Sequence, residues 1–290
     1  MFAFVSVFAI LLYLSGEFAL VLSNNLIKYV NINNILSTGE IIMLKSLVSI
    51  FLLLPFNGKY FIEKQTRKSI YKNIGLLLVL GLASVVSQFT WVNAIKRIPM
   101  NNAWLITMIF SPIISAVGAK IFFKENISKQ IKLAFAINIF AILLINKFVV
   151  VKIDWNIGYV LLFGDLLAYT TIILLTRKLR ELPSGLLVFI RFLVVLPISL
   201  VAIRHFPHLT IQIVVLTFAI SALCVVGRIC TTKGYKYLEV PLVQPLRYFN
   251  IVFAMIISFF VLGEKPTLYQ IAGGIVIIIS GIIVGLERKK

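Results

Sequence analysis

The chain has 290 residues, of which 60% are hydrophobic and 13% are charged. A soluble domain is about half apolar and about a quarter charged, so this composition excludes a soluble globular protein and indicates a polytopic membrane protein. The formal net charge of +18 would suggest a nucleic-acid partner in a soluble chain. Here the cations lie between apolar stretches, and no basic stretch alternates with exposed aromatic residues, so we expect no nucleic-acid partner.

Ten apolar segments are long enough to cross a lipid bilayer as helices, which takes about 20 residues. Turn-forming or charged residues separate them. They fall into two halves of five spans each, residues 1–149 and 150–290, and an odd number of spans turns the second half upside down in the membrane. The sequence therefore predicts an all-α integral membrane protein with two inverted five-helix repeats around a central site. The expected spans are 3–26, 38–56, 73–95, 101–122, 130–148, 156–176, 184–203, 210–232, 241–262 and 267–286.

The distribution of Lys and Arg among the loops predicts the orientation. If the N-terminus is cytoplasmic, 16 of these cations fall on the inner side and 7 on the outer side. Cytoplasmic loops of membrane proteins carry the excess of positive charge. We therefore expect both termini to be cytoplasmic.

Several ionisable side chains fall deep inside the expected spans. Such a group costs ~2.5–3.5 kcal/mol on insertion scales, so it normally faces a cavity or a partner. Two pairs are matched by the inversion: two acids lie near the middle of spans one and six, and two bases lie seven residues into spans two and seven. The six deep charges are Glu17, Lys45, Asp165, Arg191, Arg228 and Arg247.

Two interpretations of the matched charges remain open. In the first, they line or gate a transport pathway. In the second, Glu17 with Lys45, and Asp165 with Arg191, are buried ion pairs that hold each repeat together without contacting a substrate.

The ninth span contains the strongest indication of a binding site. Pro241 and Pro245 remove backbone donors and predict irregular backbone near Arg247, which a membrane protein tolerates only beside protein or a water-filled cavity. The fourth span is the polar, proline-containing counterpart in the first repeat. Nearby aromatic side chains either stack on a planar or cationic substrate or belong to ordinary packing. The substrate-binding or gating candidates are Glu17, Lys45, Gln88, Trp104, Asp165, Arg191, Arg228, Arg247 and Tyr248.

Nothing in the chain predicts catalysis, a metal or a cofactor. There is no GxxxxGK[ST] phosphate loop, so transport would have to run down a gradient or be coupled to one. A lipid-acting enzyme would need a nucleophile with a base or a metal cluster, and His205 and His208 alone are weak evidence for either.

Cys224 is expected to be a small buried hydrophobe. Gly281 and Gly285 permit close helix approach, either within the chain or in a dimer.

Two stretches of the chain together resemble the EamA-type members of the drug/metabolite transporter superfamily. In that family each half ends its fourth helix with a Glu at the loop, followed by a glycine-rich helix. The matching residues are Pro99-Met100-Asn101, Phe110-Ser111-Pro112 and Phe122-Phe123-Lys124-Glu125 in the first stretch, and Gly234-Tyr235, Pro245-Leu246-Arg247-Tyr248 and Gly263-Glu264 in the second.

The resemblance implies a secondary transporter with a central cavity, which moves a small polar metabolite by alternating access across a bacterial inner membrane. The run at 245–248 is similar to a subgroup of S-adenosylmethionine uptake carriers, so the implied substrate is amino-acid-like or S-adenosylmethionine-like. Export of amino acids or other metabolites is the alternative. The expected partners are the lipid bilayer and the substrate, in a monomer or homodimer. Lys45 departs from the family, whose second helix usually carries Arg with its bidentate geometry.

Overall fold

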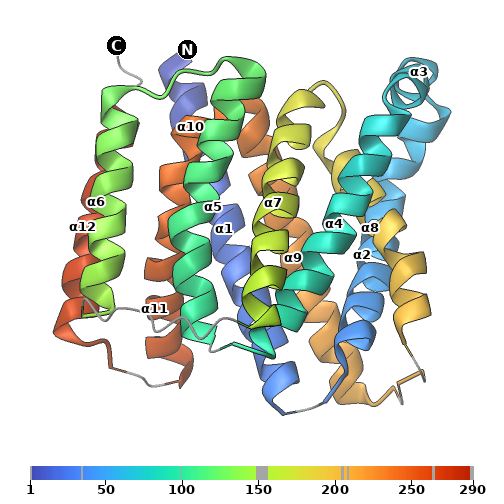
Figure 1. Cartoon of the computed structure of the whole chain (residues 1–290). Coiled ribbons are helices and arrows are strands. Elements are labelled where there is room, and N and C mark those ends of the chain that lie inside the picture. Colours follow the sequence, from blue (N-terminus) through green and yellow to red (C-terminus); the bar gives the residue numbers. More distant parts are fainter. Residues whose placement is uncertain are drawn as a thin grey trace.

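The computed structural model is a bundle of long, roughly parallel and antiparallel helices (Figure 1). It describes residues 2–33, 35–98, 100–147, 156–203, 206–207, 209–262 and 265–287. The helices of the first half are α1 Phe2–Ile32, α2 Thr38–Ile62, α3 Lys64–Lys72, α4 Ile74–Ile95, α5 Met100–Phe123 and α6 Lys129–Ile145. Those of the second half are α7 Ile157–Lys178, α8 Ser184–Ala202, α9 Ile211–Tyr237, α10 Val240–Val243, the 3-10 helix η1 Gln244–Tyr248, α11 Phe249–Leu262 and α12 Leu268–Glu287.

The predicted all-α membrane fold is confirmed. Within the described residues, 9 segments are long and apolar enough to cross a membrane. The tenth expected span is α6, an apolar helix of 17 residues. The short helix α3 was not predicted as an element, because its run KQTRKSIYK is polar and its amphipathic pattern suits a surface connection between α2 and α4.

The helices pair across the two repeats in the pattern that inversion requires. α1 packs on α9, and α7 packs on α4, which are equivalent pairs once the repeats are superposed. α2 packs on α8, and α6 on α12, so each of these helices meets its own counterpart. In Figure 1, α1 runs away from the end of the bundle that carries both termini, whereas α7 runs towards that end. The repeats therefore interlock around a common centre.

Two glycines allow α1 and α9 to pack closely. A Cβ atom on Gly16 would lie 2.8 Å from the carbonyl oxygen of Gly227, and a Cβ atom on Gly227 would lie 2.8 Å from the carbonyl oxygen of Gly16. No larger residue fits at either position without moving a backbone. Small residues allow this approach between membrane helices, and the approach places Glu17 of α1 beside α9.

Close packing within the chain accounts for Gly281, but not for Gly285. A Cβ atom on Gly281 would lie 2.5 Å from Cε2 of Phe249, in the neighbouring helix α11. A Cβ atom on Gly285 would meet nothing within 4 Å. The first glycine of the pair therefore serves an intramolecular contact.

The ninth span is broken, as its prolines predict. It begins as α10, changes to the 3-10 helix η1 from Gln244 to Tyr248, and continues as α11. The Pro245 carbonyl accepts a hydrogen bond of 3.3 Å from Nδ2 of Asn138, a buried residue of α6. A side chain of the other repeat thus satisfies a backbone group at membrane depth.

Candidate functional site

A cavity of about 150 Å³ lies at the centre of the bundle. Helices of both repeats line it, since its walls come from α1, α2, α4, α5, α7, α9 and η1. Five of the residues predicted from the sequence line this cavity together: Lys45, Gln88, Asp165, Arg228 and Arg247.

The cavity extends from the centre towards one end of the bundle. Its lining includes Lys28 near the end of α1, Ile41 near the start of α2 and Ile95 at the end of α4. These helix ends lie opposite the end that carries the two termini (Figure 1). On the predicted orientation, this is the outer side of the membrane.

Asp165 is held in the cavity wall by the opposite repeat. Oγ of Ser87, on α4, donates a hydrogen bond of 2.6 Å to Oδ1 of Asp165, on α7. The side chain is buried, with 6% of its surface exposed. Asp165 is the one carboxylate among the cavity-lining residues that the structure describes.

Arg247, in the 3-10 helix η1, is held on two sides by side chains of α5 and α7. Its Nη1 donates to Oγ of Ser111, and its guanidinium lies 4.2 Å from the centre of the Tyr169 ring. Such stacking contributes roughly 0.5–2 kcal/mol, with the larger values at desolvated sites. Tyr169 thus lines the cavity and contacts Arg247. Oγ1 of Thr107, beside these groups, is buried and has no hydrogen-bond partner in the described part of the chain.

Lys45 and Arg228 are the deep cations of the cavity with the fewest contacts. Among the described residues, the Lys45 ammonium has no hydrogen-bond or ion-pair partner, although 93% of the residue surface is covered. Nε of Arg228 donates to Sγ of Cys224 at 3.3 Å. Cys224 is therefore a hydrogen-bond acceptor rather than only the small hydrophobe that the sequence suggested. α9 continues to Tyr237, so Arg228 lies deeper in its helix than the expected span end at 232 implies.

The intra-repeat ion pairs of the structural interpretation do not form. Oε2 of Glu17 accepts a hydrogen bond of 2.8 Å from Nδ2 of Asn250, and Nε of Arg191 donates one of 2.8 Å to Oγ of Ser84. Neither Glu17 nor Arg191 lines the cavity. In each case the charge bonds to a neutral side chain of the opposite repeat, as Asp165 does.

The remaining predicted residues lie in different surroundings. Gln88 lines the cavity and donates from Nε2 to the Ser84 carbonyl at 3.3 Å, while its Oε1 has no partner in the described structure. Tyr248 is fully buried in the hydrophobic core and does not line the cavity. The side chain of Trp104 lies outside the described residues. Trp91, by contrast, contributes to the cavity wall.

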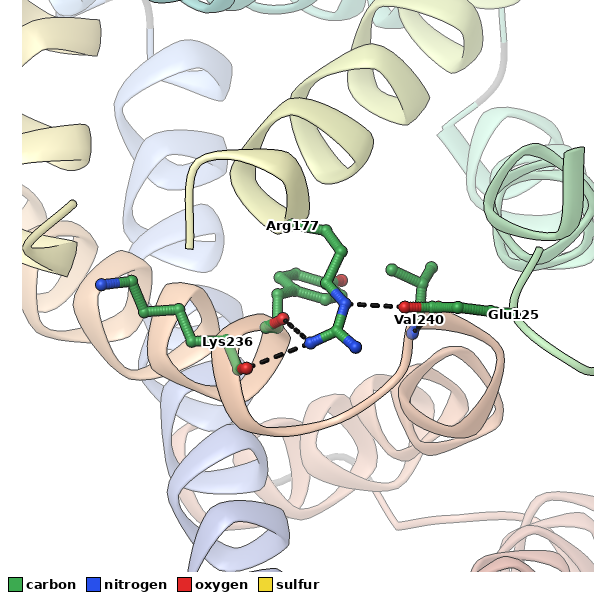
Figure 2. Close-up of polar contacts among 5 residues, drawn as sticks. Glu125, Arg177, Lys236 and Val240 are labelled. Carbon is green, nitrogen blue, oxygen red and sulfur yellow. Dashed lines mark hydrogen bonds and ion pairs between the residues drawn. The ribbon is translucent and has the colours of Figure 1, made fainter. Parts of the chain in front are cut away.

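A second polar cluster, which the sequence did not assign to the site, lies at the opposite end of the bundle. Nε of Arg177 lies 2.7 Å from Oε1 of Glu125, the one salt bridge between described residues. Figure 2 shows the Arg177 guanidinium between Glu125 and the backbone carbonyls of Tyr235 and Lys236, to which Nη1 donates at 3.2 and 3.0 Å. Oε2 of Glu125 also accepts from the Val240 amide at 2.8 Å. In the sequence Glu125 is only one of the residues that match the family, and the signal for this cluster is its position before a loop together with Arg177 in the last turn of α7.

Comparison with known proteins gives a family and a fold. The EamA-like transporter family matches residues 7–147 and 156–286, once for each half of the chain. A solved structure, described only as the crystal structure of a protein, superposes with a TM-score of 0.74 at 12% identity. That likeness covers 99% of this chain and 96% of the other, and at this identity it shows the fold alone. No curated protein matches the chain.

Proposed function

The chain belongs to the EamA-like transporter family, and from this premise we propose that it moves a small polar metabolite by alternating access. The family makes it a membrane transporter of small solutes. The finer proposal is a secondary transporter in a bacterial inner membrane, with both termini cytoplasmic. Its two repeats, residues 1–149 and 150–290, are the parts that would rearrange around the substrate.

The central cavity is the observation that carries this proposal. Both repeats contribute charged and polar side chains to it, including Lys45 and Asp165. Ionisable groups at membrane depth normally mark a substrate or ion pathway. The cavity extends towards one end of the bundle, while the Glu125–Arg177 cluster occupies the other. An alternating-access transporter exposes its site to one side of the membrane at a time, and this difference between the two ends agrees with such a conformation.

The lining supports an amino-acid-like substrate. A molecule of this class carries both a carboxylate and an ammonium group, and the cavity offers guanidinium groups together with Asp165. The volume suits a small molecule, since an engineered cavity of about 150 Å³ binds benzene. An S-adenosylmethionine-like substrate would require the cavity to widen. The lining comes from a single chain, so a monomer or each protomer of a homodimer would contain a complete pathway.

Counterflow in proteoliposomes tests the proposal. Vesicles containing the purified chain are loaded with unlabelled amino acids, nucleosides or S-adenosylmethionine, and the entry of the corresponding radiolabelled compound is measured. We expect exchange of at least one pool by the wild-type chain and by Lys120→Met, which removes a cation from an exposed position on α5. Asp165→Asn should abolish that exchange. If folded wild-type protein exchanges no pool, the proposed function is wrong.

A further inference from the structure

The centre of the protein carries more buried positive than negative charge. The deep groups in and beside the cavity are four cations, Lys45, Arg191, Arg228 and Arg247, and two carboxylates, Glu17 and Asp165. Glu17 interacts electrostatically with Arg228 and Arg247, but it forms no ion pair with either and does not line the cavity. An uncompensated charge in a low-dielectric interior is costly unless an anion neutralises it. The imbalance therefore points to an anionic ligand.

The four cations differ in how many of their donors already bind neighbouring side chains. Arg247 is held by Ser111 and the Tyr169 ring, although its buried Nε has no hydrogen-bond partner among the described residues. Arg191 donates to Ser84 outside the cavity. The Lys45 ammonium has no partner among the described residues. Arg228 uses Nε for Cys224 and keeps its two terminal nitrogens. Lys45 and Arg228 are consequently the deep cavity cations that neighbouring side chains constrain least.

Lys45 and Arg228 belong to two helices that pack directly on each other, α2 and α9. Oγ of Ser221 donates to the Lys45 carbonyl at 3.3 Å, which fixes the register of the two helices at this depth. Ser221 and Arg228 are seven residues apart, so they lie on the same face of α9 two turns from each other. Both cationic side chains reach the same cavity from this helix pair.

Unpartnered polar groups in the same wall support the presence of a ligand. Oγ1 of Thr107 and Oε1 of Gln88 are buried, line the cavity, and have no hydrogen-bond partner in the part of the chain that the structure describes. Buried polar atoms without a partner usually await a water or a bound molecule. Thr107 is only 5% exposed.

We propose that Lys45 and Arg228 form the subsite for the anionic group of the substrate, a carboxylate or a phosphate. This inference rests on the proposed transport function and names the substrate class of the same site. The guanidinium offers a planar fork of donors and the ammonium a compact point charge, so together they complement an oxyanion. Arg247, held by Ser111 and Tyr169, is a positioning residue for the wall, and Asp165 provides the acceptor for the opposite pole of the substrate.

Binding to the purified chain in detergent tests the subsite without requiring transport. The probes are pyruvate, inorganic phosphate, L-alanine and L-alaninamide, with affinity measured by isothermal titration calorimetry. L-alaninamide keeps the ammonium of L-alanine but replaces its carboxylate with a neutral amide. We expect binding of an anionic probe and at least about tenfold weaker binding of the amide. Pyruvate and phosphate distinguish a carboxylate from a phosphate site.

Substitutions then assign the binding to the two cations. Lys45→Gln and Arg228→Gln should each weaken binding of the anionic probe at least about tenfold, because each removes a charge-assisted hydrogen bond. Lys45→Arg should recover most of the affinity, and Lys120→Gln should leave it unchanged. Thermal unfolding in detergent shows whether each variant is folded. If a glutamine variant does not fold, Lys45→Met or Arg228→Met takes its place.

The outcomes separate this inference from the proposed function. Binding of an anion that depends on Lys45 and Arg228, without counterflow of any pool, would support the subsite and contradict transport. Counterflow of a cationic compound with no anion binding would support transport and overturn the subsite. Binding that persists in both glutamine variants, or no binding of any anionic probe by folded protein, would also overturn it.

Discussion

Glu125 and Arg177 form an ion pair of 2.7 Å that joins the two repeats at the end of the bundle opposite the cavity mouth. Glu125 follows α5 of the first repeat, and Arg177 lies in the last turn of α7 of the second. The side chains are only 7% and 11% exposed, so water does little to screen the pair. Glu125 also accepts from the Val240 amide at the start of α10 in the other repeat, while Arg177 donates to carbonyls in the last turn of α9 in its own repeat.

We expect Glu125→Ala to open this end of the protein. Removing one partner of a buried ion pair costs about 3–5 kcal/mol, and here the cost falls on the closed state. In a Cys230→Ser background, Cys224 beside the cavity reports access by a membrane-impermeant thiol reagent applied from the side of the termini. Labelling should rise several-fold in Glu125→Ala and remain at the wild-type level in Lys120→Ala. Unchanged labelling in Glu125→Ala would contradict a closing role for the pair.

We expect Asp165→Asn to fold and to lose transport. The amide oxygen of Asn can still accept the hydrogen bond from Ser87, so the wall keeps its shape while the negative charge disappears. Counterflow measures the loss. Ser87→Ala is the matched control, because it keeps the charge and removes a hydrogen bond worth about 1.5–3 kcal/mol. Equal transport by Asp165→Asn and wild type would exclude a substrate contact at this carboxylate.

The stacking of Arg247 on Tyr169 should contribute measurable stability. Tyr169→Leu removes the aromatic face, and we expect it to lower the free energy of unfolding by about 1–2 kcal/mol. Tyr169→Phe keeps the ring and should remain close to wild type. The comparison requires thermal or denaturant unfolding of both variants in the same detergent. A similar loss in both would assign the effect to the hydroxyl group instead.

The contact between α1 and α9 should not tolerate a side chain at Gly16. We expect Gly16→Val to reduce stability by about 1–3 kcal/mol or more, since overpacking forces backbone shifts. Gly285→Val is the control, because a Cβ atom there meets nothing within 4 Å. Unfolding midpoints in detergent check this prediction. A midpoint for Gly16→Val equal to that of the control would show that the helices separate easily.

The sequence was sufficient for the membrane class, the repeats and the break at Pro241 and Pro245, because composition, span length and proline chemistry act locally. Five of the candidate residues chosen from the sequence, mainly as polar groups inside expected spans, line the cavity. The partners of the deep charges could not be predicted. Ser84 and Ser87 read as ordinary helix serines, whose hydroxyls commonly bond to their own helix. Their contacts with Arg191 and Asp165 depend on how α4 is rotated against α7 and α8, which only the packed structure determines.

The bonding of the deep charges to neutral partners across the repeat interface has an energetic consequence. Asn250, Ser84, Ser87 and Ser111 each offer one hydrogen bond that another hydroxyl, amide or water molecule can replace. Exchanging such a bond during relative movement leaves a net cost well below the 3–5 kcal/mol of separating a buried ion pair. If the repeats move as proposed, the most costly polar contact to break between them is the Glu125–Arg177 ion pair. We expect the rate of interconversion to respond to that pair far more than to any serine of the interface.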